Sequence, residues 1–472
     1  MLSLPLAFAK AGIVVATGLM VFSALITEFS LYILCSCARR TGCTSYMDIV
    51  RFAFGPLAEI FTTSILLIFL LGVLVAFNVL LKGIFAPMAR DVLASYEFPF
   101  IAFNTDSEHF DDCVLLFILV LVSPLMLQRN LYALRHVCYV GFSSVCVIVM
   151  SIGVRATQRT IDVGFSEIKY FTTSWEDALF AFPIVVLAFL CAYNVVEVHG
   201  ALINPTRQRV KGVIHTAVTS SFVLFEAFAL VGYFYAYDTC RGNIFLNFGK
   251  YGTRFKCFWA TSTRSSHSQF YLPYELILVD PDDSLIMVGR LGMGLALIFT
   301  TPVVTLPCRE ACLSIGPQIL TWWREDQEQK KLVNSTAEST FLVSRDEESS
   351  NDPSYKYSSI SSAELDAAEL PVARQKTVQE RNVVIHVVTT MVITIAAFFV
   401  AIAAPDVAVV WSILGSSLGM IIGFIIPCGC YLKIRGRKGM TRTNIGAGSL
   451  LAFSIVVATV CTAQTIRSIE RH

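Results

Sequence analysis

Long apolar stretches recur along almost the whole chain of 472 residues, and they constrain its fold more than any other feature. The hydrocarbon core of a bilayer is about 30 Å thick, and a helix of about 20 apolar residues crosses it. Ten stretches are full or nearly full spans, and the first residues look like a fragment of another span. The eleven ranges are 1–11, 13–36, 57–81, 113–127, 137–154, 178–198, 212–236, 285–307, 383–404, 407–432 and 446–466. The sequence therefore predicts an all-α polytopic membrane domain over residues 1–466.

The composition excludes several classes of protein. Hydrophobic residues make up 55% of the chain and charged residues only 15%, whereas a soluble domain carries about 25% charge. This argues against a soluble enzyme, a nucleic-acid binder and a disordered chain. The 14 cysteines are too dilute for a disulfide scaffold, and no Cys-x-x-Cys or His-x-x-x-His spacing suggests zinc. We therefore expect no enzymatic activity, no resident cofactor and no nucleic-acid partner.

Lysine and arginine residues gather in alternate short loops. These basic loops contain Arg39, Arg40 and Arg51; Arg129 and Arg135; Arg207, Arg209 and Lys211; and Lys433, Arg435, Arg437, Lys438 and Arg442. The facing loop 89–112 is acidic instead. Because cytoplasmic loops carry the excess of lysine and arginine, the basic loops are predicted to be cytoplasmic. The alternation is consistent if residues 1–11 count as a span, which places the N terminus inside and the C terminus outside.

Two long stretches between the spans are polar. Residues 309–382 are Ser-rich and highly charged, so they are predicted to form a disordered cytoplasmic loop. This loop is either a substrate for a regulatory kinase or a plain spacer. Residues 238–283 are predicted to form an extracytoplasmic loop. A disulfide between its Cys240 and Cys257 is chemically permitted in that compartment, but the sequence does not decide whether it forms.

Two glutamates lie inside predicted spans, where a charge is costly and each ionisable residue is a functional candidate. Glu28 lies within 13–36, and Glu226 lies within 212–236. One interpretation is that each carboxyl group forms an interhelical hydrogen bond inside the bundle. The other is that these residues are protonatable groups for coupling or gating. The sequence leaves both interpretations open.

Prolines and polar residues cluster at three places within the predicted spans. The clusters are Ser3-Leu4-Pro5, the segment from Phe182-Pro183 to Asn194, and Thr300-Thr301-Pro302 followed by Thr305 and Pro307. A proline lacks the N–H donor that a helix needs, so it frees a carbonyl group. Freed backbone groups are tolerated at membrane depth only where they face protein, water or a ligand. The clusters therefore predict discontinuous helices of the kind that line the substrate sites of transporters.

The run FLCAYNVVEVHGALINPTRQRVKGV at 189–213 resembles the end of the sixth helix and the following loop in the amino acid/auxin permease family. It looks closest to the sodium-coupled neutral amino acid transporters within that family. Other segments resemble further parts of the family, in the right order. They are MLSLPLAFAKAG (1–12), TSYMDIVRFAFG (44–55), 123–144, 289–310 and 405–433. The chain is thus identified as a member of this family over most of its length outside 238–283 and 309–382.

The resemblance implies a LeuT-type fold, in which helices one to five and six to ten form inverted repeats and an eleventh helix is peripheral. Helices one and six would be unwound at mid-membrane around the substrate. The residues implied for substrate binding are Leu2, Ser3, Phe189, Leu190, Cys191, Ala192 and Asn194. Thr300 matches a hydroxyl that helps to coordinate sodium in the sodium-coupled relatives, and Thr301 lies beside it. His199 joins Glu28 and Glu226 as a candidate for coupling or gating.

The chain departs from the family at its start. Family members have a Gly-x-Gly stretch before the part that matches Met1-Leu2-Ser3, and the sodium-coupled relatives have an Asn a few residues earlier. Neither precedes Met1 in this sequence, so the first helix is incomplete at its N terminus. We expect the missing half to lie upstream of Met1; the alternative is a non-transporting relative. His199 also departs from the sodium-coupled group, which usually has Tyr there.

Two functional hypotheses follow. The first is a secondary active transporter that moves small neutral amino acids across a membrane with a coupled cation by alternating access. Thr300 and Thr301 favour sodium as that cation, while Glu28 and Glu226 leave a proton open. The second is an amino acid sensor that binds its ligand without useful flux and signals through residues 309–382. Either protein would be a multi-pass protein of the plasma membrane or of a vacuolar or lysosomal membrane.

Overall fold

The computed structural model describes residues 1–95, 109–127, 135–163, 168–172, 174–247, 284–343, 372–404, 406–435 and 441–470. Within these ranges the regular elements are helices, and there is no strand. The helices are α1 (Leu4–Ala11), α2 (Ile13–Thr41), α3 (Tyr46–Phe54), α4 (Pro56–Ser95), α5 (Phe110–Met126), α6 (Arg135–Val163), α7 (Trp175–Ala188), α8 (Ala192–Ala201), α9 (Arg207–Ala236), η3 (Tyr237–Thr239), η4 (Ile244–Asn247), α11 (Ser284–Val343), α12 (Val372–Ala403), α13 (Val407–Ile413), the π-helical turns η6 (Leu414–Gly419) and η7 (Ile421–Ile425), α14 (Ile426–Arg435) and α15 (Arg442–Glu470).

Eight helical stretches are long and apolar enough to cross a membrane. They are Ile13–Thr41, Pro56–Arg90, Trp175–Ala201, Arg207–Thr239, Gly289–Gln327, Val384–Ala403, Val407–Arg435 and Arg442–Arg467. The other three predicted spans coincide with shorter helical stretches: α1 has 8 residues, α5 has 17, and the apolar part of α6 is Gly141–Thr157. The chain is therefore a multi-pass membrane protein.

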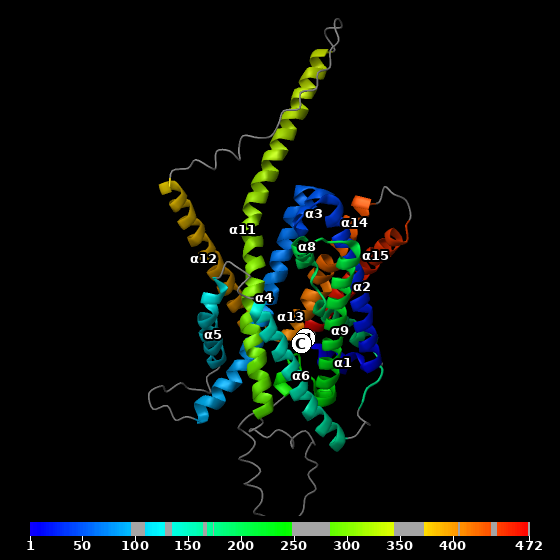
Figure 1. The fold of residues 1–472 in the computed structure, drawn as a ribbon, viewed down its shortest axis with the longest axis vertical. Helices are drawn as coiled ribbons and strands as arrows, with labels where there is room; N and C mark the ends of the chain where they lie inside the picture. Colours follow the sequence, from blue (N-terminus) through cyan, green and yellow to red (C-terminus); the bar gives the residue numbers. More distant parts are fainter. Residues whose placement is uncertain are drawn as a thin grey trace, which may run out of the picture.

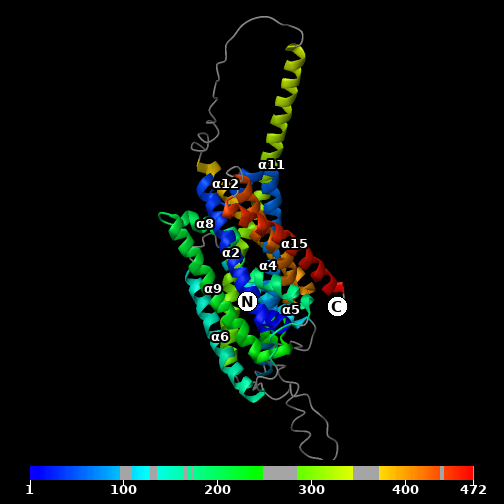
Figure 2. The same ribbon diagram turned by 90° about the vertical axis from the view of Figure 1, so that its right-hand side faces the viewer.

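The helices form one elongated bundle (Figure 1). α11 packs along α4 and α6, and α12 packs against α4. α2 packs between α9 and α14. Figure 1 shows α3, α8 and α14 at one end of the bundle, and α11 extends beyond that end, as the view in Figure 2 also shows. The basic segments on α2, α3 and α14 that the sequence assigns to the cytoplasm thus lie at the same end.

Residues 309–343 are helical, so the prediction of a disordered loop over 309–382 is wrong for this part. α11 continues to Val343, and α12 begins at Val372, so residues 372–382 are helical as well. Residues 344–371 lie outside the described ranges. A polar composition shows that a segment buries little surface, but it does not prevent a helix. The Glu, Gln, Lys and Leu residues after Trp323 are strong helix formers, and extending an existing helix avoids the cost of nucleation.

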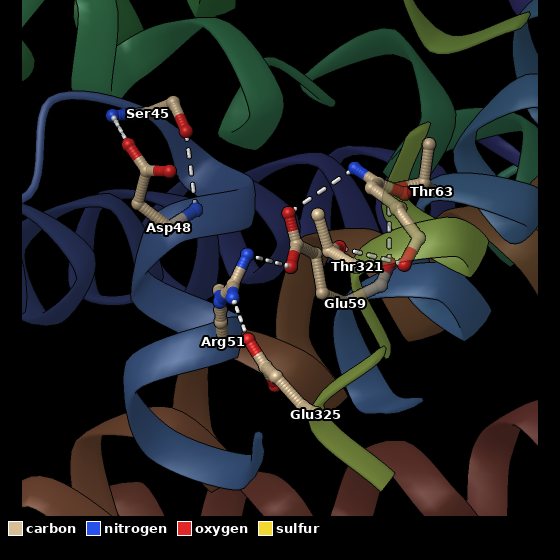
Figure 3. A network of polar contacts seen from close by, with 8 residues as sticks. Ser45, Asp48, Arg51, Glu59, Thr63, Thr321 and Glu325 are labelled. Atoms are coloured by element: carbon tan, nitrogen blue, oxygen red, sulfur yellow. Dashed lines mark hydrogen bonds and ion pairs between the residues drawn. The ribbon is translucent and has the colours of Figure 1, made fainter. Parts of the chain in front are cut away.

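A polar network joins this continuation of α11 to the bundle (Figure 3). The guanidinium group of Arg51 on α3 lies between Glu59 of α4, at 3.4 Å, and Glu325 of α11, at 2.8 Å. Gln318 of α11 also donates to Glu59, at 3.1 Å. The polar end of α11 is therefore attached to two other helices rather than free of them.

The three proline clusters have three different outcomes. At Ser3-Leu4-Pro5 a helix begins, with Pro5 in its first turn, where a missing N–H costs little. The stretch that starts at Pro183 is interrupted at 189–191, between α7 and α8. The expected interruption at Thr300-Thr301-Pro302 is absent, because α11 runs on through its prolines. Local kinking without a full break is enough to accommodate a proline in a packed membrane helix.

Candidate functional site

The interruption between α7 and α8 is the centre of the candidate site. Phe189 and Leu190 close α7 with N–H donors to carbonyls three residues earlier, at 3.1 and 3.2 Å. Cys191 then leaves the helical region, with φ −139° and ψ 15°, and α8 starts at Ala192. The last carbonyls of one half-helix and the first N–H groups of the next therefore lack regular helical partners inside one apolar stretch. These two ends carry opposite partial charges, so the place can bind a polar ligand.

The residues of the interruption divide between a packed side and an open side. The ring of Phe189 packs edge-on against Phe225 of α9, with the ring centroids 5.5 Å apart. Phe189 and Ala192 are buried, whereas Cys191 and Asn194 are exposed. A ligand could thus reach the free backbone groups from the side of Cys191 and Asn194.

The start of α1 lies against the chain that follows α9. α1 packs on both α7 and α9, and the Ile244 N–H donates to the Leu2 carbonyl at 3.4 Å. Leu2 and Ser3 are both buried. The Ser3 hydroxyl donates to the Gly242 carbonyl at 2.6 Å. Ser3 would therefore have to release Gly242 before its hydroxyl could donate a hydrogen bond to a ligand.

Thr300 and Thr301 project to different sides of α11. Each donates its hydroxyl hydrogen to the carbonyl four residues earlier, at 2.6 and 2.8 Å, so each oxygen keeps lone pairs for another ligand. Thr300 is exposed, whereas Thr301 is fully buried. Thr301 lines a small gap between helices with Asn78 of α4 and Thr394 of α12, and this gap has no room for a water-sized molecule. The structure therefore does not bring the two hydroxyls into one site.

Both intramembrane glutamates bridge α2 and α9. The Thr17 hydroxyl donates to Glu226 at 2.5 Å, and both carboxylate oxygens of Glu28 lie 3.2 Å from Nδ1 of His215. The two pairs are spaced by 11 residues on each helix, from 17 to 28 and from 215 to 226, which is the pattern of antiparallel neighbours. The interhelical contacts of the first interpretation are thus present, and proton exchange at these groups stays a prediction.

Sequence reasoning missed His215, the partner of Glu28. The available signal was an ionisable residue inside the predicted span 212–236, one turn after Lys211. His199 lies on α8, where it is buried and its Nε2 has no hydrogen-bond partner. Because α8 begins after the interruption, His199 lies outside residues 189–191.

Two further predictions concern metals and disulfides. Across the described ranges, no three His, Cys, Asp or Glu side chains gather in a way that could hold a metal ion. Cys240 is buried near the end of α9. Cys257 lies outside the described residues, so the Cys240–Cys257 disulfide stays a prediction.

Comparison with protein families identifies the bundle. The family described as "Transmembrane amino acid transporter protein" matches residues 1–264 and 274–467. The chain belongs to this family. The match confirms the resemblance that the run at 189–213 indicates.

Individual relatives within the family are distant. "Vacuolar amino acid transporter 5" of Schizosaccharomyces pombe is 24% identical over 313 residues, which are 66% of this chain and 64% of that protein. "Putative sodium-coupled neutral amino acid transporter 11" of Danio rerio is 20% identical over 460 residues, 97% of this chain and 80% of that protein. The Rattus norvegicus protein of the same name is 24% identical over 322 residues, 66% of this chain and 61% of that protein. The match therefore spans less than two thirds of the yeast and rat relatives.

One solved structure, a Na⁺-coupled sialic acid symporter in a substrate-bound outward-open state, aligns with 98% of this chain and 88% of its own. The sequence identity is 11% and the TM-score is 0.40.

Proposed function

We propose that the chain is a secondary active transporter that moves small neutral amino acids across a membrane by alternating access. The interruption of α7–α8 at residues 189–191 carries the proposal, because it exposes backbone groups of both polarities inside a stretch long enough to cross the membrane. Membership of a family of amino acid transporters supports an amino acid as the substrate. We further propose that the helices follow the LeuT-type inverted repeat of five plus five helices with an eleventh helix.

The backbone groups at the interruption suit the part that all amino acids share. An ammonium group would donate hydrogen bonds to the carbonyls at the end of α7, around Phe189 and Leu190. A carboxylate would face the start of α1, where Leu2 and Ser3 precede the positive end of the helix. The side chains of residues 186–194 carry no charge, which suits a substrate with a neutral side chain.

We propose sodium as the coupling ion and place it beside Thr300. Its hydroxyl hydrogen is donated within α11, which leaves an exposed oxygen to bind a hard cation. The names of the Danio rerio and Rattus norvegicus relatives include sodium coupling, which fits this choice. A proton is the other candidate ion, because the Glu28–His215 pair and Glu226 are ionisable groups within the spans.

Uptake by the full chain in proteoliposomes tests the proposal. We expect radiolabelled alanine to accumulate when sodium is higher on one side and to stop accumulating when an ionophore collapses that gradient. Protein-free liposomes serve as the control. A proton gradient applied without sodium distinguishes the two candidate ions. Amino acid binding without accumulation under either gradient would overturn the transport proposal in favour of a sensor.

A further inference from the structure

Two buried side chains hold the backbone of the π-helical segment between α13 and α14. This segment comprises η6 (Leu414–Gly419) and η7 (Ile421–Ile425). A π-helical turn shifts the regular hydrogen bonds of the helix, so its carbonyls can accept other donors. Tyr46 of α3 donates to the Ile422 carbonyl at 2.9 Å, and Ser30 of α2 donates to the Gly423 carbonyl at 2.5 Å.

Both donors are well placed to hold the segment still. Ser30 is 1% exposed and Tyr46 is 3% exposed. Burial raises the pKa of the Tyr46 phenol well above its usual range, so this group remains a protonated donor. A buried hydroxyl that loses its acceptor leaves unsatisfied polar groups, which opposes any displacement of the carbonyls. α2 and α3 therefore fix the π-helical segment from one side.

The π-helical segment also touches the interruption of α7–α8, at Leu190. A methyl group added at Gly423 would lie 2.7 Å from Cδ1 of Leu190, closer than real side-chain atoms approach. Near the start of the same segment, Gly415 lies so close to the backbone of Pro183 that no side chain fits at this position. Gly423 leaves the room that the end of the Leu190 side chain fills, so a displacement of Gly423 changes the packing of Leu190.

We infer that Ser30 and Tyr46 are positioning residues for the substrate site: they fix the π-helical segment, and its Gly423 packs against Leu190 at the interruption. Neither residue touches the substrate in this scheme. The consequence for substrate affinity rests on the proposed function. The structural part of the inference does not, because it concerns only the position of residues 189–191.

The exposed thiol of Cys191, next to Leu190, reports on this position without any transport measurement. In the full chain in liposomes, peptide mass spectrometry would give the rate of N-ethylmaleimide alkylation at Cys191 relative to Cys113, an exposed thiol in the first turn of α5. Ser30→Ala and Tyr46→Phe are each expected to change this ratio about fivefold, the factor that one net hydrogen bond represents.

Matched variants separate positioning from general damage. Ser23→Ala makes the same chemical change on α2, but the Ser23 hydroxyl is buried without a partner, so the ratio is expected to stay as in the wild type. Gly423→Ala is expected to change the ratio, whereas Gly448→Ala is not, because a methyl group at Gly448 meets nothing within 4 Å. An unchanged Cys191 ratio in all of Ser30→Ala, Tyr46→Phe and Gly423→Ala would overturn the inference.

Transport then gives the second readout. Ser30→Ala and Tyr46→Phe are expected to raise the KM for alanine about fivefold and to change kcat much less, because the fold stays intact while the binding groups shift. A chain that transports nothing even as wild type would refute the proposed function, and the Cys191 ratio would still decide the inference. Wild-type transport with an unchanged Cys191 ratio would refute the inference alone.

Discussion

Thr300 and Thr301 are adjacent and chemically alike, yet they have different surroundings. Thr300 is exposed on α11, whereas Thr301 is buried among α4, α11 and α12. We therefore expect Thr300→Val to raise the sodium concentration for half-maximal uptake about fivefold, since one oxygen ligand is lost. Thr301→Val is the matched control and should leave the sodium concentration for half-maximal uptake unchanged. A sodium titration of alanine uptake measures both, and an equal shift in the two variants would contradict the placement of the ion at Thr300.

Sequence analysis could name these residues but not their surroundings. The resemblance points to a threonine at this place in α11, but neighbouring residues on a helix are turned by about 100° from each other, so only one of the pair faces a given side. Ser3 shows the same limit. Its hydrogen bond to the Gly242 carbonyl joins residues that are distant in the sequence, and no local pattern predicts such a contact.

The antiparallel pairing of α2 with α9 puts the two interpretations of Glu226 to a test. Glu226→Gln keeps an acceptor for the Thr17 hydroxyl at the same place but removes the titrating group. If the residue only joins the helices, thermal melting and sodium-driven uptake should match the wild type. Glu226→Leu loses the contact and should cost about 0.6 kcal/mol, the mean for an interhelical hydrogen bond in a membrane. Loss of uptake in Glu226→Gln with unchanged melting would instead indicate proton coupling.

Helices were predictable where the pattern is long and apolar. All eleven predicted spans overlap described helices, although only eight helical stretches are long and apolar enough to cross a membrane. The interruption at 189–191 lies within the cluster that follows Pro183. Two features of α11 were not predictable on the same grounds. Its prolines lie in a helix that stays continuous through packing against α4 and α6, and its polar end is helical although its composition resembles that of a disordered segment. The content of proline and of charged residues indicates only the local conformational preference of a segment. Whether the segment is helical also depends on its packing and on whether it extends a helix that has already formed.

The extended end of α11 is joined to α3 and α4, because Arg51 of α3 binds both Glu59 and Glu325 (Figure 3). The ion pair with Glu325 is about half exposed on both sides, with side-chain exposures of 41% and 49%. A pair of this kind contributes about 0.2–1 kcal/mol. Glu325→Gln should therefore lower the melting temperature only slightly. Arg51→Gln should lower it more, since it also leaves the buried carboxylate of Glu59, with a side-chain exposure of 9%, without its cation.

The contacts of Arg51 indicate which part of the polar stretch 309–382 can be deleted without disturbing the helix bundle. Residues 344–371 lie beyond Glu325 and beyond the described end of α11, so deleting them leaves the whole network around Arg51 in place. We expect this deletion to preserve sodium-driven alanine uptake and the melting temperature if the chain is a transporter, because none of the proposed binding groups is affected. A sensor that signals through this segment would keep its amino acid binding but lose its output. Uptake lost on this deletion, with melting unchanged, would show that the segment takes part in transport itself.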